Sequence, residues 1–518
     1  MIDHVLKLAK SAILAGCVAL TPLAKAEVVY FPESILEEAV SKVIGVELEK
    51  LRLKLETDLA QVRNNQKTAP SSQALAYSVL VNKLNAKISQ VEVDIGDLPS
   101  RLTKDLLAKY LFSFELNGAE VRDLTGLEAA ENLQVITLRN NLITDLTPLS
   151  GLKKLRSVDL RGNRVNSLES LKDLPSLREL DLSQNKLKGI AGIEVLPSLR
   201  KLDVSENELQ ELTGISQLKN LGSLFAQGNK LGVSEPFDDQ NGNGTFDLGE
   251  TYKDISGNGA WDNATLSELD GLLHLHELYL YRNGISDVSK WGALPALQTL
   301  LLGVNEISDI TSLKQYTALQ TLSLNQNEVT DLGPLITLSS LIYLDLSENR
   351  LSDLRPLRNM VSLRKVYLND NNLTDLRPMA GLRSLEILSI NSNLVSDLRP
   401  MANLRKLKRL DAGRNLVELE SDWNEPVIKA LARHQVQLRH DGQGAMIEGL
   451  LELGEALIGD KAANSELGNY LLANGYSRLR EYHADTKVDE SAKSSAYRQW
   501  TKAIREHEID QLPRLADL

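Results

Sequence analysis

The hydrophobic residues in the middle of this 518-residue chain recur with a period of 22 residues. A representative unit, residues 341–362, reads LIYLDLSENRLSDLRPLRNMVS, and the following unit repeats the pattern. Because alternate residues of a strand face opposite sides, Leu344 and Leu346 face one side of a short strand. Tyr343 and Asp345 then face the other side. One strand in each unit predicts stacked units that share a parallel sheet.

An asparagine follows the strand in twelve of these units. Its side-chain amide can donate to, and accept from, the backbone of the turn that holds it. Stacked copies would form a buried ladder of polar side chains, which is tolerated where every member is hydrogen-bonded. The column consists of Asn141, Asn163, Asn185, Asn207, Asn229, Asn283, Asn305, Asn327, Asn349, Asn371, Asn393 and Asn415.

An aspartate stands four residues after the asparagine in seven of the units. We interpret it as a turn or cap residue on the limb that returns to the next strand. The column consists of Asp145, Asp287, Asp309, Asp331, Asp353, Asp375 and Asp397.

The pattern L-x-x-L-x-L-x-x-N-x-L resembles that of bacterial leucine-rich repeat proteins with short, internalin-like repeats, over residues 111–440. The resemblance implies an α/β fold, a curved right-handed leucine-rich repeat solenoid, whose concave parallel sheet binds another macromolecule. One unit cannot bury its apolar side alone, so neighbours must stack and both ends need covers.

Helical patterns flank the repeats on both sides. Residues 27–110 show apolar residues at helical spacing before and after a turn at 70–72, which predicts a helical cap and hairpin. We expect this region to shield the first repeat; a helical surface for a partner is the alternative. After the repeats, 425–434 predicts a helix and 436–439 a strand. Residues 441–518 predict a polar helical segment.

One gap in the asparagine column is longer than the others. Asn229 and Asn283 lie 54 residues apart, which corresponds to one ordinary unit of 22 residues and an insertion of 32 residues. The insertion, at about 232–265, contains the calcium-loop pattern D-x-[DN]-x-[DN]-G-x5-E, in which short oxygen-bearing side chains wrap a hard cation. A weaker second loop follows, with Thr265 at its twelfth position and Glu268 as a substitute. The expected Ca²⁺ ligands are Asp239, Asn241, Asn243, Thr245, Asp247 and Glu250, then Asp254, Ser256, Asn258, Ala260 and Asp262. An ion-free polar surface loop is the alternative.

Strand residues that point away from the core form the expected binding face. Its Asp159, Asp181 and Asp203 are interpreted as a solvated surface. Aromatic residues make up 4% of the chain, yet several fall at outward strand positions. Exposed aromatic rings supply contact area and are favoured at interfaces. The predicted partner-binding residues are Phe225, Tyr279, Tyr281, Tyr343 and Tyr367.

The first 26 residues have the pattern of a secretory signal peptide: lysines, an apolar stretch at 11–24, and Ala24-Lys25-Ala26. The run Leu14-Ala15-Gly16-Cys17 also resembles a lipobox, which would give a lipid-anchored protein. Cleavage after Ala26 is favoured because the apolar stretch continues past Cys17. No later segment approaches the ~20 continuous apolar residues that cross a bilayer.

The net charge is −12, and removal of the leader, which carries +2, would leave −14. Such a surface disfavours nucleic acid and suits cations or basic partners. No common catalytic motif occurs, and His274 and His276 have no third zinc ligand in view. We expect an exported, calcium-binding protein that recognises a protein or glycan and is not an enzyme. The alternatives are an enzyme acting through Glu448, Glu452 and Glu455, and an envelope scaffold anchored at Cys17.

Overall fold

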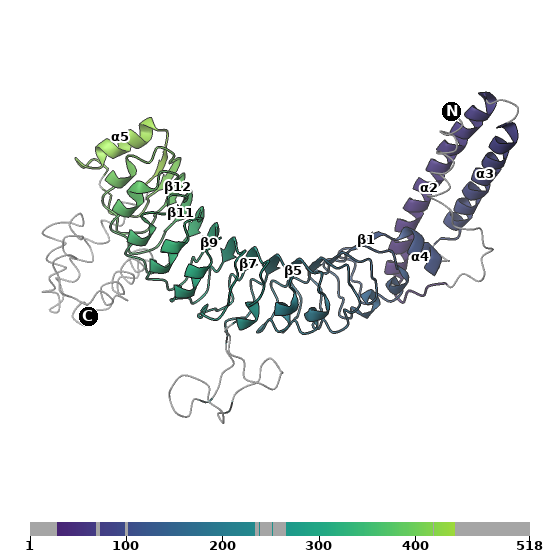
Figure 1. The fold of residues 1–518 in the computed structure, drawn as a ribbon, viewed down its shortest axis with the longest axis horizontal. Helices are drawn as coiled ribbons and strands as arrows, with labels where there is room; N and C mark the ends of the chain where they lie inside the picture. Colours follow the sequence, from purple (N-terminus) through teal and green to yellow (C-terminus); the bar gives the residue numbers. More distant parts are fainter. Residues whose placement is uncertain are drawn as a thin grey trace.

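A computed structural model describes residues 28–68, 73–98, 102–233, 238, 251, 266–417 and 419–440. Within them, fourteen parallel strands form one sheet, and each strand pairs with the next one in sequence. The sheet follows the inner side of a curved stack (Figure 1). The predicted α/β solenoid is therefore confirmed. The predicted signal peptide, both calcium loops and the predicted helical segment 441–518 lie outside the described residues.

Each strand spans three residues, and the middle residue is buried in β1 to β13. In all neighbouring strand pairs except β6–β7 and β13–β14, paired residues are 22 positions apart, for example Leu322 and Leu344, as the repeat predicts. The strands are β1 Ser113–Glu115, β2 Val135–Thr137, β3 Ser157–Asp159, β4 Glu179–Asp181, β5 Lys201–Asp203, β6 Ser223–Phe225, β7 Glu277–Tyr279, β8 Thr299–Leu301, β9 Thr321–Ser323, β10 Tyr343–Asp345, β11 Lys365–Tyr367, β12 Ile387–Ser389, β13 Arg409–Asp411 and β14 Gln437–Arg439.

Short 3₁₀ helices lie on most of the limbs that return to the next strand. The aspartate column fixes many of these limbs, because each carboxylate accepts the backbone N–H two residues later; Thr311 N, for instance, lies 2.8 Å from Asp309 Oδ1. The turn role predicted for this column is confirmed. The 3₁₀ helices are η2 Leu127–Ala129, η3 Thr147–Leu149, η4 Ile193–Val195, η5 Ile215–Gln217, η6 Ser267–Leu269, η7 Thr311–Gln315, η8 Gly333–Thr337, η9 Arg355–Leu357, η10 Arg377–Gly381 and η11 Arg399–Met401.

The asparagine column forms the predicted buried ladder, and it joins neighbouring repeats. The Nδ2 group of Asn327 donates to the carbonyls of Leu324 at 3.1 Å and Asn325 at 3.2 Å in its own repeat. It also donates to Leu302 O of the preceding repeat at 2.9 Å, and its Oδ1 accepts from Ile307 N at 3.0 Å. All twelve ladder asparagines are at most 9% exposed.

The ladder continues across the insertion. Strand β6 pairs with β7 in register, although the paired residues are 54 positions apart. Asn283 donates to Ala226 O at 3.0 Å, and its Oδ1 accepts from Leu231 N at 3.4 Å. A side chain at Gly232 would overlap the backbone of Gly284, so the chain leaves the stack where two glycines meet. The inserted residues therefore do not interrupt the sheet.

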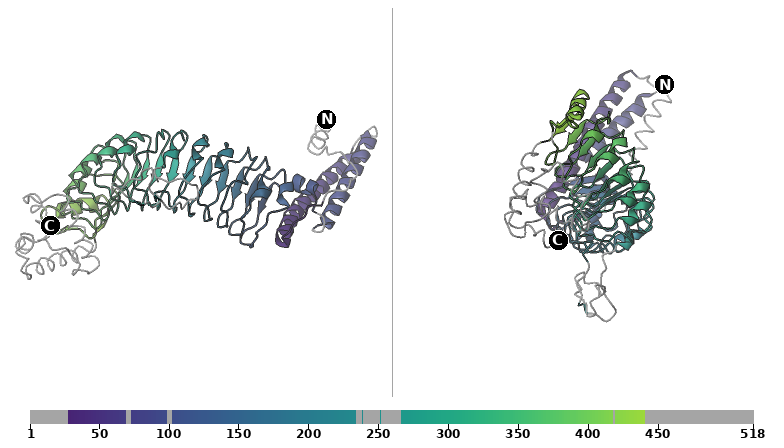
Figure 2. Two further views of the ribbon diagram at one scale, coloured as in Figure 1. Left: turned by 90° about the horizontal axis from the view of Figure 1, so that it is seen from below. Right: turned by 90° about the vertical axis from the view of Figure 1, so that its left-hand side faces the viewer.

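The N-terminal region contains α2 (Ser34–Thr68), α3 (Ala74–Gly96) and α4 (Lys104–Tyr110). The start of α2 covers the first repeat: Leu36, Val40 and Ile44 are fully buried, and Glu33 accepts the N–H groups of residues 122 and 123. The rest of α2 runs antiparallel to α3 and stands out from the end of the solenoid (Figures 1 and 2). The expected shielding role thus falls to the first turns of α2 and to α4, which contacts both α2 and η2 and whose Leu107 is fully buried. No helix in the described ranges is long and apolar enough to cross a membrane.

The last repeat is closed by α5 (Glu425–Arg433) and β14, in agreement with the predicted helix and strand. Asn424 precedes α5 and is fully buried. Its Oδ1 accepts from Leu398 N at 2.9 Å, and its Nδ2 donates to Ser396 O at 2.8 Å. This side chain takes over, at the end of the stack, the bridging role of the ladder.

We predict that Asn327→Ala destabilises the protein by about 3 kcal/mol, because it removes four hydrogen bonds from a buried turn. The matched control is Asn325→Ala, which removes an amide of the same size from the outward face two residues away and is expected to cost less than about 1 kcal/mol. Urea unfolding followed by circular dichroism gives both values. Equal losses would show that the ladder bonds contribute no special stability.

Candidate recognition face

Three of the predicted partner-binding residues form one cluster on the outward face of the sheet, hereafter the first aromatic cluster. Phe225 of β6 and Tyr279 of β7 are paired across the sheet. Their ring centroids lie 4.5 Å apart at an interplanar angle of 34°, close enough for a favourable aromatic contact. Tyr281 follows two residues after Tyr279 on the same face and is 41% exposed.

A glycine gives the first aromatic cluster its shape. A Cβ atom at Gly303 would lie 3.0 Å from the ring of Tyr281 and would collide with Asn325, so a larger residue cannot stand there without moving its neighbours. Tyr281 therefore lies across the repeat that follows its own. Leu301, beside Tyr279 in β8, extends the apolar surface in the same direction.

Charged side chains border the first aromatic cluster. The Nζ atom of Lys201 lies 5.2 Å from the ring centroid of Phe225, within the range of a cation–π interaction. On the other border, Arg282 donates to both carboxylate oxygens of Glu206, at 2.6 and 2.5 Å. This ion pair passes over Gly228, where an added Cβ would meet both partners. The cluster is thus an aromatic patch with a polar rim.

The other two predicted residues form the second aromatic cluster. Tyr343 of β10 and Tyr367 of β11 have ring centroids 5.5 Å apart. Burial raises the pKa of Tyr343 to about 12, and burial also raises the pKa of Tyr279. Both phenols therefore remain neutral at physiological pH. They offer an apolar ring and a hydroxyl group that can donate a hydrogen bond.

The outward aspartates have a structural role that the interpretation as a solvated surface missed. Asp181 Oδ1 accepts from Ser183 N at 2.9 Å and from Ser183 Oγ at 2.6 Å. Asp203 makes the same two bonds with Ser205, and burial is the main cause of its raised pKa. These carboxylates hold the end of their own strand.

Sequence reasoning also missed a second polar ladder, on the outward face beside the second aromatic cluster. Asn369 Oδ1 accepts from Asn391 N at 2.9 Å and from Ser389 Oγ at 2.6 Å. Asn391 Oδ1 accepts from Gly413 N at 2.8 Å. The signal was present in the sequence, because the two asparagines are one repeat length apart. Further along, Arg409 pairs with the buried Asp411 at 2.7 Å.

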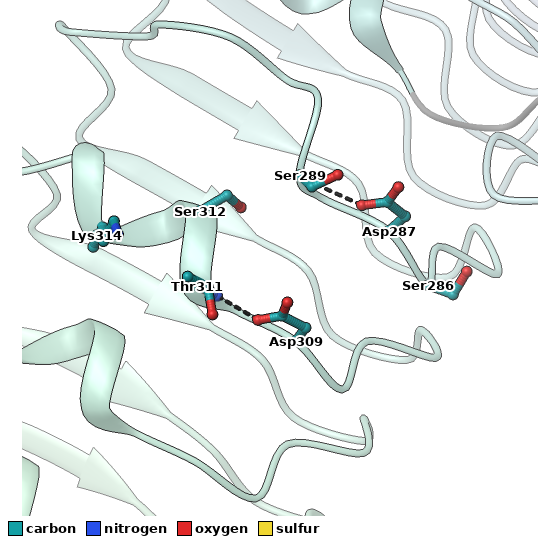
Figure 3. A pocket seen from close by; sticks show the side chains of 7 residues that line it. All are labelled: Ser286, Asp287, Ser289, Asp309, Thr311, Ser312 and Lys314. Carbon is teal, nitrogen blue, oxygen red and sulfur yellow. Dashed lines mark hydrogen bonds between the residues drawn. The ribbon is translucent and has the colours of Figure 1, made fainter.

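A pocket of about 410 Å³ lies between two neighbouring return limbs (Figure 3). Asp287 and Asp309 line it, and each carboxylate already accepts a backbone N–H, from Ser289 and Thr311. The bonds from Thr311 lower the pKa of Asp309. These carboxylates shape the turns, and we assign the pocket no binding role.

No group of three or more histidine, cysteine, aspartate or glutamate residues is placed to hold a metal ion within the part of the chain that the structure describes. The predicted calcium ligands lie outside that part. Within the insertion, beyond residues 232–233, the structure describes Asp238 and Thr251, and Asp238 N donates to Thr251 O at 2.8 Å. His274 and His276 are exposed, and His274 Nδ1 lies 2.9 Å from Lys219 O.

Comparison with known proteins supports the leucine-rich repeat fold. The family model of the leucine-rich repeat domain of endo-β-N-acetylglucosaminidase EndoS matches residues 88–207, and that of leucine-rich repeats in two copies matches 317–359 and 361–403. No curated protein matches the chain.

Two solved structures have the same fold. An internalin of Listeria monocytogenes is 23% identical, with a TM-score of 0.50, over 66% of this chain and 84% of that one. A leucine-rich repeat protein of Leptospira interrogans is 21% identical, with a TM-score of 0.50, over 65% and 91% of the two chains. The chain is a leucine-rich repeat protein with internalin-like structural neighbours.

Proposed function

We propose that this chain binds another protein through the concave face of its sheet, with the two aromatic clusters as the principal contacts. Leucine-rich repeat proteins generally mediate protein–protein recognition. The observation that carries the proposal is the tilted ring pair Phe225–Tyr279 with the exposed Tyr281 beside it, on strands that the buried ladder holds in register. Aromatic side chains at the centre of a polar rim are typical of binding hot spots.

One partner surface of ordinary size spans both clusters. Strands β7 and β10 are three strand spacings apart, which corresponds to about 14 Å. A standard protein interface covers about 800 Å² on each partner, so both clusters fit within one footprint. Leu301 and Ser323 occupy the strands between them. Because the strands are already ordered, binding costs little backbone entropy on this side of the interface.

We predict that a photoreactive p-benzoylphenylalanine in place of Tyr281 cross-links a discrete protein partner, whereas the same group at Ile336 does not. Ile336 is 60% exposed and lies on a return limb in η8, away from the strands. For the partner identified in this way, Phe225→Ala should weaken binding by about 2 kcal/mol, roughly thirtyfold, as measured by calorimetry.

Trp423→Ala is the control for aromatic loss, since Trp423 is 42% exposed and precedes the C-terminal helix α5. Unchanged affinity in Phe225→Ala, or equal cross-linking from Ile336, would refute the assignment of this face. If the chain instead captures a glycan, and Phe225→Ala abolishes that binding, the assignment of the recognition face stands and the partner is a glycan rather than a protein. Hydrolysis of a substrate that survives Phe225→Ala would instead favour the enzyme alternative.

We also propose that the insertion binds Ca²⁺. The support is the sequence pattern, which places Asp239, Asn241 and Asn243 at the first three ligand positions and closes the loop with Glu250. The duplicated loop that begins at Asp254 adds to this support. Calcium loops of extracellular modules have dissociation constants on the order of 10⁻⁴–10⁻³ M.

Calorimetric titration with CaCl₂ should therefore show saturable binding in that range for the intact chain. We predict that Asp239→Ala and Glu250→Ala abolish the first binding event. Asp238→Ala is the matched control, because it removes the same charge from the residue directly before the loop. An equal loss of Ca²⁺ binding in all three variants would show that binding depends only on the negative charge of this region. Absence of binding in the parent chain would refute the site.

We propose that the chain is exported, with cleavage after Ala26. The lysines, apolar stretch and Ala24-Lys25-Ala26 support this, and Leu14-Ala15-Gly16-Cys17 supports the alternative of a lipid anchor. Intact mass of the protein from its native host is expected to correspond to a chain that starts at Glu27. A chain starting at a lipid-modified Cys17 would establish the anchored scaffold instead, and an uncleaved chain would refute export by this route.

A further inference from the structure

The helical hairpin is paired along most of its length, and one side of α3 makes this pairing. Gly45 and Leu98 meet near the solenoid, and Gln66 donates to Ser78 Oγ at 3.0 Å near the far end. On α3, Leu84 and Val91 are buried toward α2. They belong to a row with alternating steps of four and three residues, as in a coiled coil. The row consists of Tyr77, Val81, Leu84, Ile88, Val91 and Ile95.

Helix α3 carries a second row of the same kind on its opposite side, which we name the outer seam. Its members also follow alternating steps of four and three residues, and they are Leu75, Val79, Asn82, Ala86, Ser89 and Val93. All six are exposed, and the three large apolar ones are 78%, 46% and 56% exposed at positions 75, 79 and 93. The outer seam contains no charged residue over a length of about 27 Å.

A solvated helix surface normally carries charged residues on the side away from its partner. The charges of α3 are Lys83, Lys87, Glu92 and Asp94, and at 100° per residue they fall on its flanks, between the two rows. The outer seam therefore has the composition of a coiled-coil contact. Ala86 and Ser89 are small enough to let a second helix approach closely, and Asn82 is the kind of polar residue that fixes register at such a contact.

The charge distribution favours a second copy of the hairpin as the occupant of the outer seam. Residues 34–96 contain eight basic and eight acidic side chains, so the hairpin is neutral, whereas the whole chain carries −12. Two copies of the solenoid repel one another, while two copies of the hairpin do not. Beyond the first turns of α2 the hairpin stands out from the end of the solenoid (Figures 1 and 2), which leaves room for the outer seams of two copies to meet.

We propose that the chain forms a homodimer in which the outer seams of two α3 helices pack together, with each α2 on the outside of a four-helix assembly. The contact is isologous, since the same row of residues supplies both sides. A dimer of this kind presents two recognition faces on one particle. Simultaneous engagement of two partner molecules would then raise the apparent affinity without new contacts at either face.

The test is sedimentation of the full chain carrying Cys17→Ser, which removes its single cysteine. We predict a reversible dimer over a wide range of concentration and a monomer in the variant Val79→Glu, Val93→Glu. Ile336→Glu is the control, because it places a charge at a comparably exposed apolar residue of the solenoid and should leave the dimer intact. Circular dichroism of each variant at low concentration verifies that the helices persist.

Cross-linking supplies an independent readout that does not depend on disrupting the contact. In the same cysteine-free chain, Ala86→Cys treated with a bifunctional maleimide should give a covalent dimer, whereas Ser340→Cys, an exposed position on the solenoid, should not. A monomer at all concentrations would overturn the proposal. So would a dimer that survives Val79→Glu, Val93→Glu, or equal cross-linking from Ser340→Cys.

Discussion

The structure depends on hydrogen bonds that a buried asparagine makes to two repeats at once. An amide group in an apolar interior is costly unless its donors and acceptor are all bonded. Here the Nδ2 group of each asparagine donates to carbonyls of its own turn and to a carbonyl of the preceding repeat, and its Oδ1 accepts an N–H of that repeat. In Asn349, Nδ2 donates to Leu346 O and Leu324 O, and Oδ1 accepts from Val329 N. A strand shifted by one residue would leave that amide unpaired. The ladder therefore fixes the register that leucine packing alone would specify less strictly.

The same bonds hold a backbone conformation that most side chains avoid. The residue before each ladder asparagine has a positive φ, and several of these residues are not glycine; Val304, for example, has φ 54°. Such strain persists where the surroundings over-determine it. Because every repeat makes the same turn, the sheet has one uniform spacing, which continues across β6 and β7 in spite of 32 inserted residues. Both aromatic clusters are thereby placed on one rigid surface.

Much of the fold followed from the sequence because its signals are local and repeated. The alternation at Leu344 and Leu346 predicted the strands, and the aspartate column predicted the turns. The bond from the asparagine to the preceding repeat was not predictable from one unit, because it depends on how units stack. The two rows of α3 were not separated for a related reason, since only the packing against α2 shows which row is covered and which is exposed. The outward tyrosines were identified correctly by position, but their pairing as Tyr343–Tyr367 required the register of neighbouring strands.

The central claim is that one uninterrupted ladder carries the whole recognition face, and native-state hydrogen exchange tests it most directly. The backbone N–H groups bonded to ladder asparagines include Leu231 on one side of the insertion and Ile285 on the other. If the ladder is continuous, these two groups exchange as slowly as Ile307 and Val329 in the middle of the stack. Rapid exchange at Leu231 and Ile285, with protection retained at Ile307 and Val329, would contradict the account, because the solenoid would then consist of two blocks that open independently at the insertion.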